Sequence, residues 1–309
     1  MEHSQETTAE PAPPDAAQTG FDPETHARRA ASFGAAATDY AMHRPDYPVD
    51  AIGWAMAPAL ASIERAHKGK RARYAPHPPS GPAQSARPID VLDLGAGTGK
   101  LTAQLADLET SAGKPRVVAV EPDPQMLGEL RRRLPSVRAL AGKAEEIPLP
   151  DGSVDFVIAG QAIHWFNLDL AIPEIARILR PGGVLAGLWN ADDARVAWVA
   201  RLHEASGRRT VVPIGGVERD DDDMNDWLGS AGKRLFFPPE DEEFTHSHVR
   251  TAESMIATLR THSAFLIMSA EEREAALANV REYLDSTPET ASGEFSLPLI
   301  TLALRAVRR

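Results

Sequence analysis

Apolar residues in the middle of the chain form short runs that alternate with amphipathic stretches. Five runs, each as long as a buried strand, occupy residues 89–94, 116–120, 137–141, 154–158 and 184–189. Before the last run, Ile172, Ile175 and Ile178 recur at helical spacing, which makes one stripe of that segment apolar. The alternation of buried strands with one-sided helices predicts an α/β fold, a doubly wound sheet with helices on both faces.

Further elements are expected on either side of this region. The patterns predict helices over residues 49–66, 198–205, 223–228, 251–259 and 270–284, and strands over residues 243–249 and 295–307. Pro58 lies inside the first of these helices and is expected to kink or split it, because proline removes a backbone donor and clashes with the preceding turn.

One domain, residues 26–309, is expected to follow a short tail. Residues 1–25 are rich in Glu, Thr, Ala and Pro and poor in bulky apolar residues, so they are expected to be disordered. Residues 67–88 are basic and rich in proline, which predicts a flexible insertion rather than a continuous helix. The cations of this insertion suit a solvated charge run, or a binding arm.

Composition narrows the classes of function. The chain has 309 residues and a formal charge of -11, which argues against a nucleic-acid surface. It has no cysteine, so disulfides, thiolate zinc sites and a cysteine nucleophile are excluded. No apolar run reaches membrane-spanning length and no secretory leader is recognisable, so neither a membrane nor a secreted location is expected. These features favour a soluble cytoplasmic protein.

Three glycines at alternate positions follow the first buried run. They are Gly95, Gly97 and Gly99, within the sequence RPIDVLDLGAGTGKL, and they leave bare backbone for a ligand to approach. Lys100 stands where a dinucleotide fingerprint needs its third glycine, so a nicotinamide or flavin dinucleotide fits poorly. Asp93 would repel a pyrophosphate and suits a cationic ligand.

This glycine motif resembles motif I of the class I S-adenosylmethionine-dependent methyltransferases. The resemblance extends from Phe33 to the C-terminus, is strongest over residues 89–190, and includes the Leu-Arg-Pro-Gly-Gly sequence that ends at Gly183. It implies a Rossmann-like sheet of seven strands with the last strand antiparallel. It also implies a cofactor-binding core at residues 89–190, followed by a C-terminal region, residues 191–309, that completes the domain and selects the acceptor.

The segment before the core resembles the lid of the trans-aconitate methyltransferase-like group. By this resemblance, residues 30–66 form a lid in which Tyr40, Arg44 and Tyr47 close over the cofactor. Arg44 would then pair with the methionine carboxylate or with an acidic substrate, since a guanidinium binds carboxylates through two parallel hydrogen bonds. A surface helix with a solvated arginine is the alternative.

Two more stretches carry expected cofactor contacts. Glu121 follows the second strand, where an acidic residue accepts hydrogen bonds from ribose hydroxyls, although such a residue can instead cap the next helix. The resemblance places the adenine near Ala144 and Glu145. Lys143 departs from the family pattern there, because lysine cannot accept a hydrogen bond from the adenine amino group.

The fourth strand leads into the segment expected to face the methyl acceptor. Gln161 and His164 are the candidate catalytic residues, with His164 as a general base or as a group that orients the acceptor. A core histidine bonded to backbone is the alternative for His164. His246, His248 and His262 lack a carboxylate at ligand spacing, so no metal is expected.

These residues together predict methyl transfer from S-adenosylmethionine to a small-molecule acceptor by direct in-line displacement. Three alternatives stay open: an NAD(P)-dependent oxidoreductase on a similar fold, a non-catalytic cofactor-binding or regulatory protein, and a macromolecular methyltransferase that recruits RNA through residues 67–88.

Overall fold

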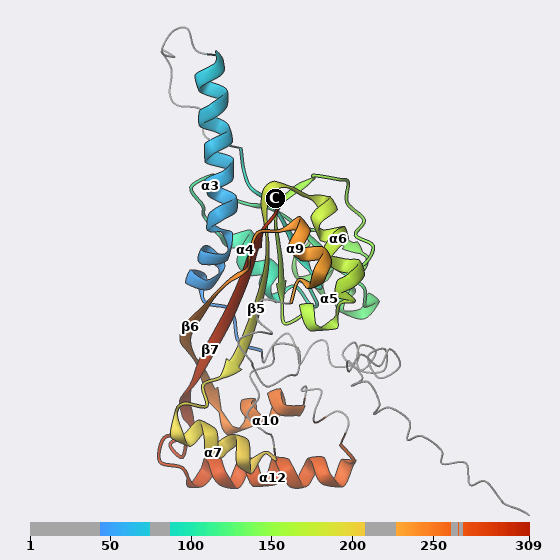
Figure 1. The fold of residues 1–309 in the computed structure, drawn as a ribbon. Coiled ribbons are helices and arrows are strands. Elements are labelled where there is room, and N and C mark those ends of the chain that lie inside the picture. Colours follow the sequence, from blue (N-terminus) through green and yellow to red (C-terminus); the bar gives the residue numbers. More distant parts are fainter. Residues whose placement is uncertain (1–43, 75–86, 208–226, 261–264, 266–267) are drawn as a thin grey trace, which may run out of the picture.

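A single seven-stranded sheet organises the protein (Figure 1), seen here in a computed structural model that describes residues 44–74, 87–207, 227–260, 265 and 268–309. The strand order is β3-β2-β1-β4-β5-β7-β6. The strands are β1 (Asp90–Leu94), β2 (Arg116–Glu121), β3 (Arg138–Ala141), β4 (Val154–Gly160), β5 (Leu179–Asp192), β6 (Glu240–Thr251) and β7 (Glu294–Val307). Strands β1 to β5 pair in parallel, and β7 runs antiparallel to both of its neighbours. The predicted α/β sheet with an antiparallel last strand is therefore confirmed.

Helices cover both faces of this sheet. Helices α3 (Val49–Tyr74) and α4 (Lys100–Asp107) pack against one face, where they share a buried cluster with Val91, Phe156 and Val184. Helix α5 (Pro124–Arg133) joins that layer through Leu130, which packs on Ala119 of β2. Helices α6 (Leu168–Ile178) and α9 (Gly229–Leu235) cover the other face.

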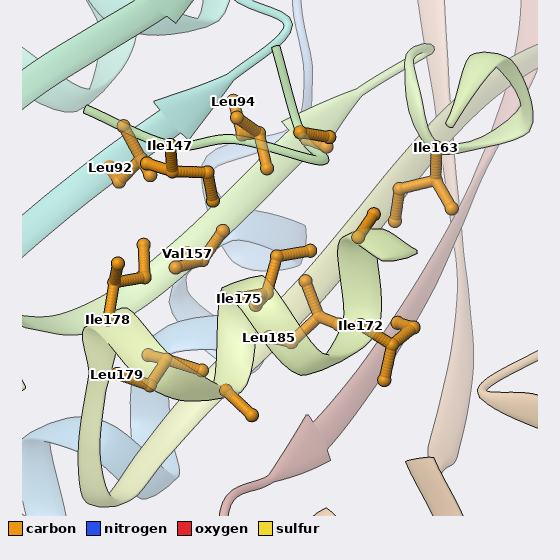
Figure 2. Packing of buried hydrophobic residues seen from close by; sticks show 14 of the residues in the cluster. Leu92, Leu94, Ile147, Val157, Ile163, Ile172, Ile175, Ile178, Leu179 and Leu185 are labelled. Carbon is orange, nitrogen blue, oxygen red and sulfur yellow. The ribbon is translucent and has the colours of Figure 1, made fainter. Parts of the chain in front are cut away.

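The packing of α6 shows why its apolar stripe was predictive. Ile172, Ile175 and Ile178 point from the helix towards Val157 and Leu185 of the sheet (Figure 2). All five side chains are essentially inaccessible to solvent. Removing such side chains from water is the main driving force for attaching the helix to the sheet, at about 1.5–3 kcal/mol per residue.

Three helices form a separate layer beyond the parallel strands. Helices α7 (Ala197–Ala205), α10 (Ala252–Arg260) and α12 (Ala270–Ser286), together called the cap, lie at the end of the β6–β7 pair away from the chain terminus (Figure 1). They enclose their own apolar cluster around Phe295, Leu297 and Leu299 of β7. The cap therefore lies on the side of the sheet where the parallel strands have their carboxyl ends.

Some predicted boundaries were wrong. Helix α3 is not split at Pro58 and continues to Tyr74, so the predicted insertion at 67–88 starts as a helix. The reason is that no proline follows Pro58 until Pro76, while Lys, Arg and Ala between them favour helix. Strand β5 begins at Leu179, so the tight turn predicted at residues 180–183 lies within this strand. Helix α9 was not predicted.

Other predictions fall partly or wholly outside the described residues. The tail at 1–25, the first part of the predicted lid (residues 30–43) and residues 75–86 lie there. Of the helix predicted at 223–228, only Trp227 and Leu228 are described, and they form a turn. Among the described residues, no helix is long and apolar enough to cross a membrane.

An ion-pair cluster joins β1 and β4 at their amino ends. Asp155, 4% exposed, accepts hydrogen bonds of 2.6 and 2.5 Å from Arg87 and lies 3.0 Å from Arg180. Burial would raise the pKa of Asp155, but these bonds hold it below its ordinary value. This cluster fixes the two central strands at the end opposite to the glycine turn.

Candidate functional site

The glycine turn lies at the carboxyl end of β1, as the sequence predicts. Gly95, Gly97 and Gly99 all have left-handed backbones, with φ of 70°, 57° and 83°. The turn folds back on β2 because the amide of Gly95 donates to the carbonyl of Val120 at 2.9 Å. A Cβ atom on Gly95 would lie 2.7 Å from the Cβ of Ala162, so no larger residue fits there. The turn thus exposes backbone where a ligand can lie against it.

A buried carboxylate lies directly beneath this turn. Asp93 is 1% exposed, and its Oδ2 accepts a hydrogen bond of 2.6 Å from Thr102. Its Oδ1 is also buried and has no hydrogen-bond partner among the described residues. Burial, reinforced by the charge of Glu121, raises the pKa of Asp93 to about 7. A buried acceptor without a donor is costly in a folded protein and is expected where a ligand completes the site.

A second buried carboxylate closes the other side of the turn. Glu121, 5% exposed, accepts the Gly97 and Asp123 amides, both at 2.8 Å. Burial raises its pKa, and these two bonds oppose the rise. The capping role considered for Glu121 belongs to Asp123, whose side chain accepts the Gln125 and Met126 amides at the start of α5. Two backbone amides therefore fix the side chain of Glu121 beside the turn.

This pair of carboxylates fits the expected cofactor. A sulfonium and an ammonium group match an acidic site, whereas a pyrophosphate would be repelled by it. A carboxylate has about four lone-pair positions, so Glu121 can accept ribose hydroxyls beside its two backbone donors. Met126, 8% exposed, lies with its sulfur close to the position that a Cβ on Gly97 would occupy, where a flat ring could pack.

The end of β4 has a strained backbone. Gln161 has φ of 54° and is the only residue other than glycine with positive φ in the described part of the chain. Its amide donates to Leu188, and its side-chain Nε2 donates to the backbone oxygen of Asn190, both at 2.8 Å. Left-handed backbone at such a residue costs free energy and often occurs at functional sites. The side chain of Gln161 is thereby directed along the end of β5.

His164 lies in the 3-10 helix η1 (Ile163–Trp165), which begins two residues after Gln161. Its ring is partly buried and packs against Trp165, with 5.0 Å between ring centroids. Phe166 extends towards the glycine turn, since its ring would lie 3.5 Å from a Cβ on Gly95. The ring of Phe166 therefore meets the turn from the β4 side, and His164 and Trp165 directly precede Phe166 along the chain.

A short segment, residues 44–48, crosses these strand ends and is called the strap. Asn190 donates through Nδ2 to the carbonyls of Asp46 and Pro45, at 3.1 and 3.4 Å. Gln104 of α4 forms two further hydrogen bonds with the backbone of Tyr47. The ring of Tyr47 packs over Gly160, where a Cβ would lie 2.7 Å from its hydroxyl. The strap thus covers the ends of β4 and β5.

Sequence reasoning missed the residues that hold the strap. Asn190 is a hub, because its Oδ1 also accepts a 2.5 Å hydrogen bond from Thr301 of β7. The sequence indicates only that Asn190 is a polar residue at the end of a predicted strand. Its contact with the strap depends on the fold. Tyr40, the other predicted lid residue, lies outside the described residues.

The two residues predicted to contact adenine have different surroundings in the structure. Ala144 is buried at 3% exposure within the apolar cluster beside α6. Glu145 accepts the amide of Asn167 at 2.7 Å, next to the start of α6, so part of its carboxylate already has a structural use. Lys143 is exposed in a tight turn. The roles of Ala144 and Glu145 towards adenine stay predictions.

Two of the three histidines considered for a metal site lie on β6, where one of them contacts a neighbouring strand. His246 lies with Nε2 3.0 Å from the hydroxyl of Thr301, and His248 follows it on the same face of β6. His262 lies outside the described residues. In the part of the chain that the structure describes, no group of three His, Asp or Glu residues could hold a metal ion.

Comparison with known proteins shows that the chain is similar to methyltransferases. A family model described as a methyltransferase domain matches residues 92–187. An uncharacterized methyltransferase of Mycobacterium tuberculosis is 37% identical over 276 residues, which is 89% of this chain and 95% of the relative. A malonyl-[acyl-carrier protein] O-methyltransferase of Methylococcus capsulatus is 38% identical over 121 residues, covering 37% of this chain and 43% of that protein. The solved structure of a candidate type II methyltransferase from Anaeromyxobacter dehalogenans is 27% identical, with a TM-score of 0.52, and covers 86% of this chain and 97% of its own.

Proposed function

The chain belongs to the class I S-adenosylmethionine-dependent methyltransferases, and on that premise we propose that it methylates a small-molecule acceptor by direct displacement. The observation that carries the proposal is the glycine turn between two buried carboxylates, Asp93 and Glu121. That arrangement suits a cofactor with cationic groups and a ribose and without phosphates.

Each side of the turn would hold a different part of the cofactor. When bound, S-adenosylmethionine supplies a methyl group on a positively charged sulfur. Glu121 would accept the ribose hydroxyls, and the bare backbone from Gly95 to Gly99 would lie against the cofactor. Asp93 would stabilise its positive charge from below, through the Oδ1 that has no hydrogen-bond partner in the described part of the chain.

The acceptor would approach from the β4 side of the turn. Gln161 and His164 lie at this strand end, and the aromatic rings of Trp165 and Phe166 would reduce the access of water. His164 would take a proton from the acceptor or orient it, since its ordinary pKa is near neutrality. Most of the rate enhancement would come from positioning the two reactants in line and from excluding water.

A small acceptor is supported by how the strand ends are covered. The strap crosses the ends of β4 and β5, which would restrict the space open to a bulky acceptor on this side of the turn. The same site would suit a protein that binds the cofactor without catalysing a reaction. Such a protein would bind S-adenosylmethionine and would not transfer its methyl group.

The test follows the label of S-[methyl-³H]-adenosylmethionine in a cell extract. A labelled compound that passes an ultrafiltration membrane, separates from S-adenosylmethionine on chromatography and is missing from extract without the added protein supports the proposal. Label in RNA or protein would contradict a small acceptor, and unchanged S-adenosylmethionine would favour a binding protein. With a labelled acceptor in hand, His164→Ala should reduce kcat by at least tenfold and leave affinity for S-adenosylhomocysteine unchanged. His164→Asn separates the loss of a base from the loss of packing.

A further inference from the structure

A polar row interrupts an otherwise apolar face of the sheet, and the transfer chemistry described above does not use it. On β7, Ala303 packs in the apolar cluster beneath α3, whereas Leu299 packs in the cluster of the cap. Thr301 lies between them on the same face, because side chains of a strand alternate, and it is fully buried. Towards the cap this face carries Asp192 of β5 and Arg250 of β6, which attract each other. The row therefore lies where the α3 layer ends and the cap begins.

The hydrogen bonds of this row have a fixed direction. Nδ2 of Asn190 donates to the backbone oxygens of Pro45 and Asp46, which can only accept. Oδ1 of Asn190 therefore faces Thr301 and receives the single proton of its hydroxyl group, at 2.5 Å. Nε2 of His246 lies 3.0 Å from the same hydroxyl oxygen. Because the hydroxyl proton is already donated to Asn190, Nε2 of His246 must carry the proton of this second bond.

This arrangement makes the other ring nitrogen of His246 an acceptor. A neutral imidazole with its proton on Nε2 can only accept at Nδ1. Burial lowers the pKa of His246, so the neutral ring predominates at neutral pH. Among the described residues, Thr301 is the only hydrogen-bond partner of this ring. The side chain is only partly buried, so a small molecule can reach it.

The row is connected to the strand end that would face the acceptor. Gln161 donates to the backbone oxygen of Asn190, so hydrogen-bonded residues link the end of β4 to Thr301 and His246. Thr301 lies two strands away from β4 in the sheet order, about 10 Å between backbones at ordinary strand spacing. An acceptor that is methylated beside β4 and also reaches His246 must extend over a similar distance.

We propose, building on the methyl-transfer function above, that Nδ1 of His246 accepts a hydrogen bond from a hydroxyl or amino group of the methyl acceptor. This group lies several bonds away from the methylated atom. Thr301 and Asn190 act as positioning residues, because they fix the tautomer of His246 and thereby its preference for a donor. A site built to bind a hydroxyl or amino group rejects analogues that lack it, since its own polar group would then stay unpaired.

The first test uses the full chain, saturating S-[methyl-³H]-adenosylmethionine and the ultrafiltrate of the cell extract as the source of acceptor. Rates over a dilution series of this ultrafiltrate give kcat and an apparent KM. His246→Gln keeps an N–H donor near the position of Nε2 and removes Nδ1, whereas His246→Asn places an amide oxygen near the position of Nδ1. The apparent KM should rise at least about fivefold in His246→Gln, with kcat within about twofold, and by a smaller factor in His246→Asn. A role confined to holding Thr301 would give the opposite order.

The second test measures the tautomer without any acceptor. In ¹⁵N NMR of the histidine-labelled protein saturated with S-adenosylhomocysteine, His246 should carry its proton on Nε2, and Thr301→Val should remove this preference. Ser247→Ala is the matched control for both tests, because Ser247 is exposed on the opposite face of β6. It should change neither the tautomer nor the apparent KM.

Thermal melting and affinity for S-adenosylhomocysteine show whether each variant is folded. A proton on Nδ1 of His246, an unchanged apparent KM in folded His246→Gln, or a larger rise in His246→Asn than in His246→Gln would overturn the proposal. If the unmodified protein labels no compound of the ultrafiltrate, the proposed function itself is contradicted, whatever the tautomer of His246.

Discussion

Asp93 is a residue whose burial should make the free protein less stable. Its pKa is raised from 3.8 to about 7, which corresponds to a cost of about 4 kcal/mol for the ionised group in the folded state. Asp93→Asn keeps the acceptor for Thr102 and removes the charge. At pH 8 this variant should unfold at a higher urea concentration than the unmodified protein, by up to about 4 kcal/mol in free energy of unfolding.

The sign of the pH dependence follows from the direction of the pKa. Because the folded protein holds the proton of Asp93 more tightly than the unfolded chain does, its stability falls as pH rises from about 4 to about 7. Above that window both states are ionised and the cost stays constant. The advantage of Asp93→Asn should therefore be about 3 kcal/mol larger at pH 8 than at pH 5.

The same substitution should weaken cofactor binding. Loss of one interaction with a charged group costs about 1.5–3 kcal/mol, or about tenfold or more in Kd. The loss should be larger for S-adenosylmethionine than for S-adenosylhomocysteine, because only the former has the positive sulfur. Since Glu121 contributes to the raised pKa of Asp93, Glu121→Gln should reduce the gain in stability. An Asp93→Asn variant with the same advantage at pH 5 and pH 8 would refute this reasoning.

Three further substitutions, the first with a matched control, separate effects on binding from effects on folding. Glu121→Ala should weaken S-adenosylhomocysteine binding at least tenfold by calorimetry, whereas Glu129→Ala, which removes only a surface pair with Arg132, should not change it. Asn190→Ala removes the hydrogen bonds to the strap and to Thr301, so limited proteolysis should cut residues 44–48 faster. An unchanged cleavage rate would show that Asn190 does not hold the strap in place. Asp155→Asn weakens the ion pairs with Arg87 and Arg180, so urea unfolding should show a free energy of unfolding lower by about 2 kcal/mol. Affinity for S-adenosylhomocysteine should not change, because Asp155 lies at the amino end of β4, away from the glycine turn.

The parallel half of the sheet was predictable because each element carries its own pattern. The continuous apolar runs of β1, β4 and β5 predicted central strands, and the isoleucine stripe of α6 matched the face that it covers. The glycine turn was equally local, since left-handed backbone at Gly95, Gly97 and Gly99 favours glycine. Boundaries were harder, because Pro58 lies within one continuous α3.

Residues that act through distant contacts could not be found in this way. Arg250 and Asp192 are 58 positions apart along the chain, and only the course of β5, β7 and β6 brings them into electrostatic contact. Asn190 looks like any strand-end residue until the strap lies against it. Glu145 is a further example, because the sequence did not reveal that its carboxylate accepts the Asn167 amide at the start of α6.

Calorimetric titration of the purified protein with S-adenosylhomocysteine, with NADH as control, tests the central claim most directly. Micromolar affinity for S-adenosylhomocysteine and none for NADH is the predicted result, because two buried carboxylates flank the glycine turn. Binding of NADH, or of neither compound, would contradict the assignment of this turn as a site for S-adenosylmethionine.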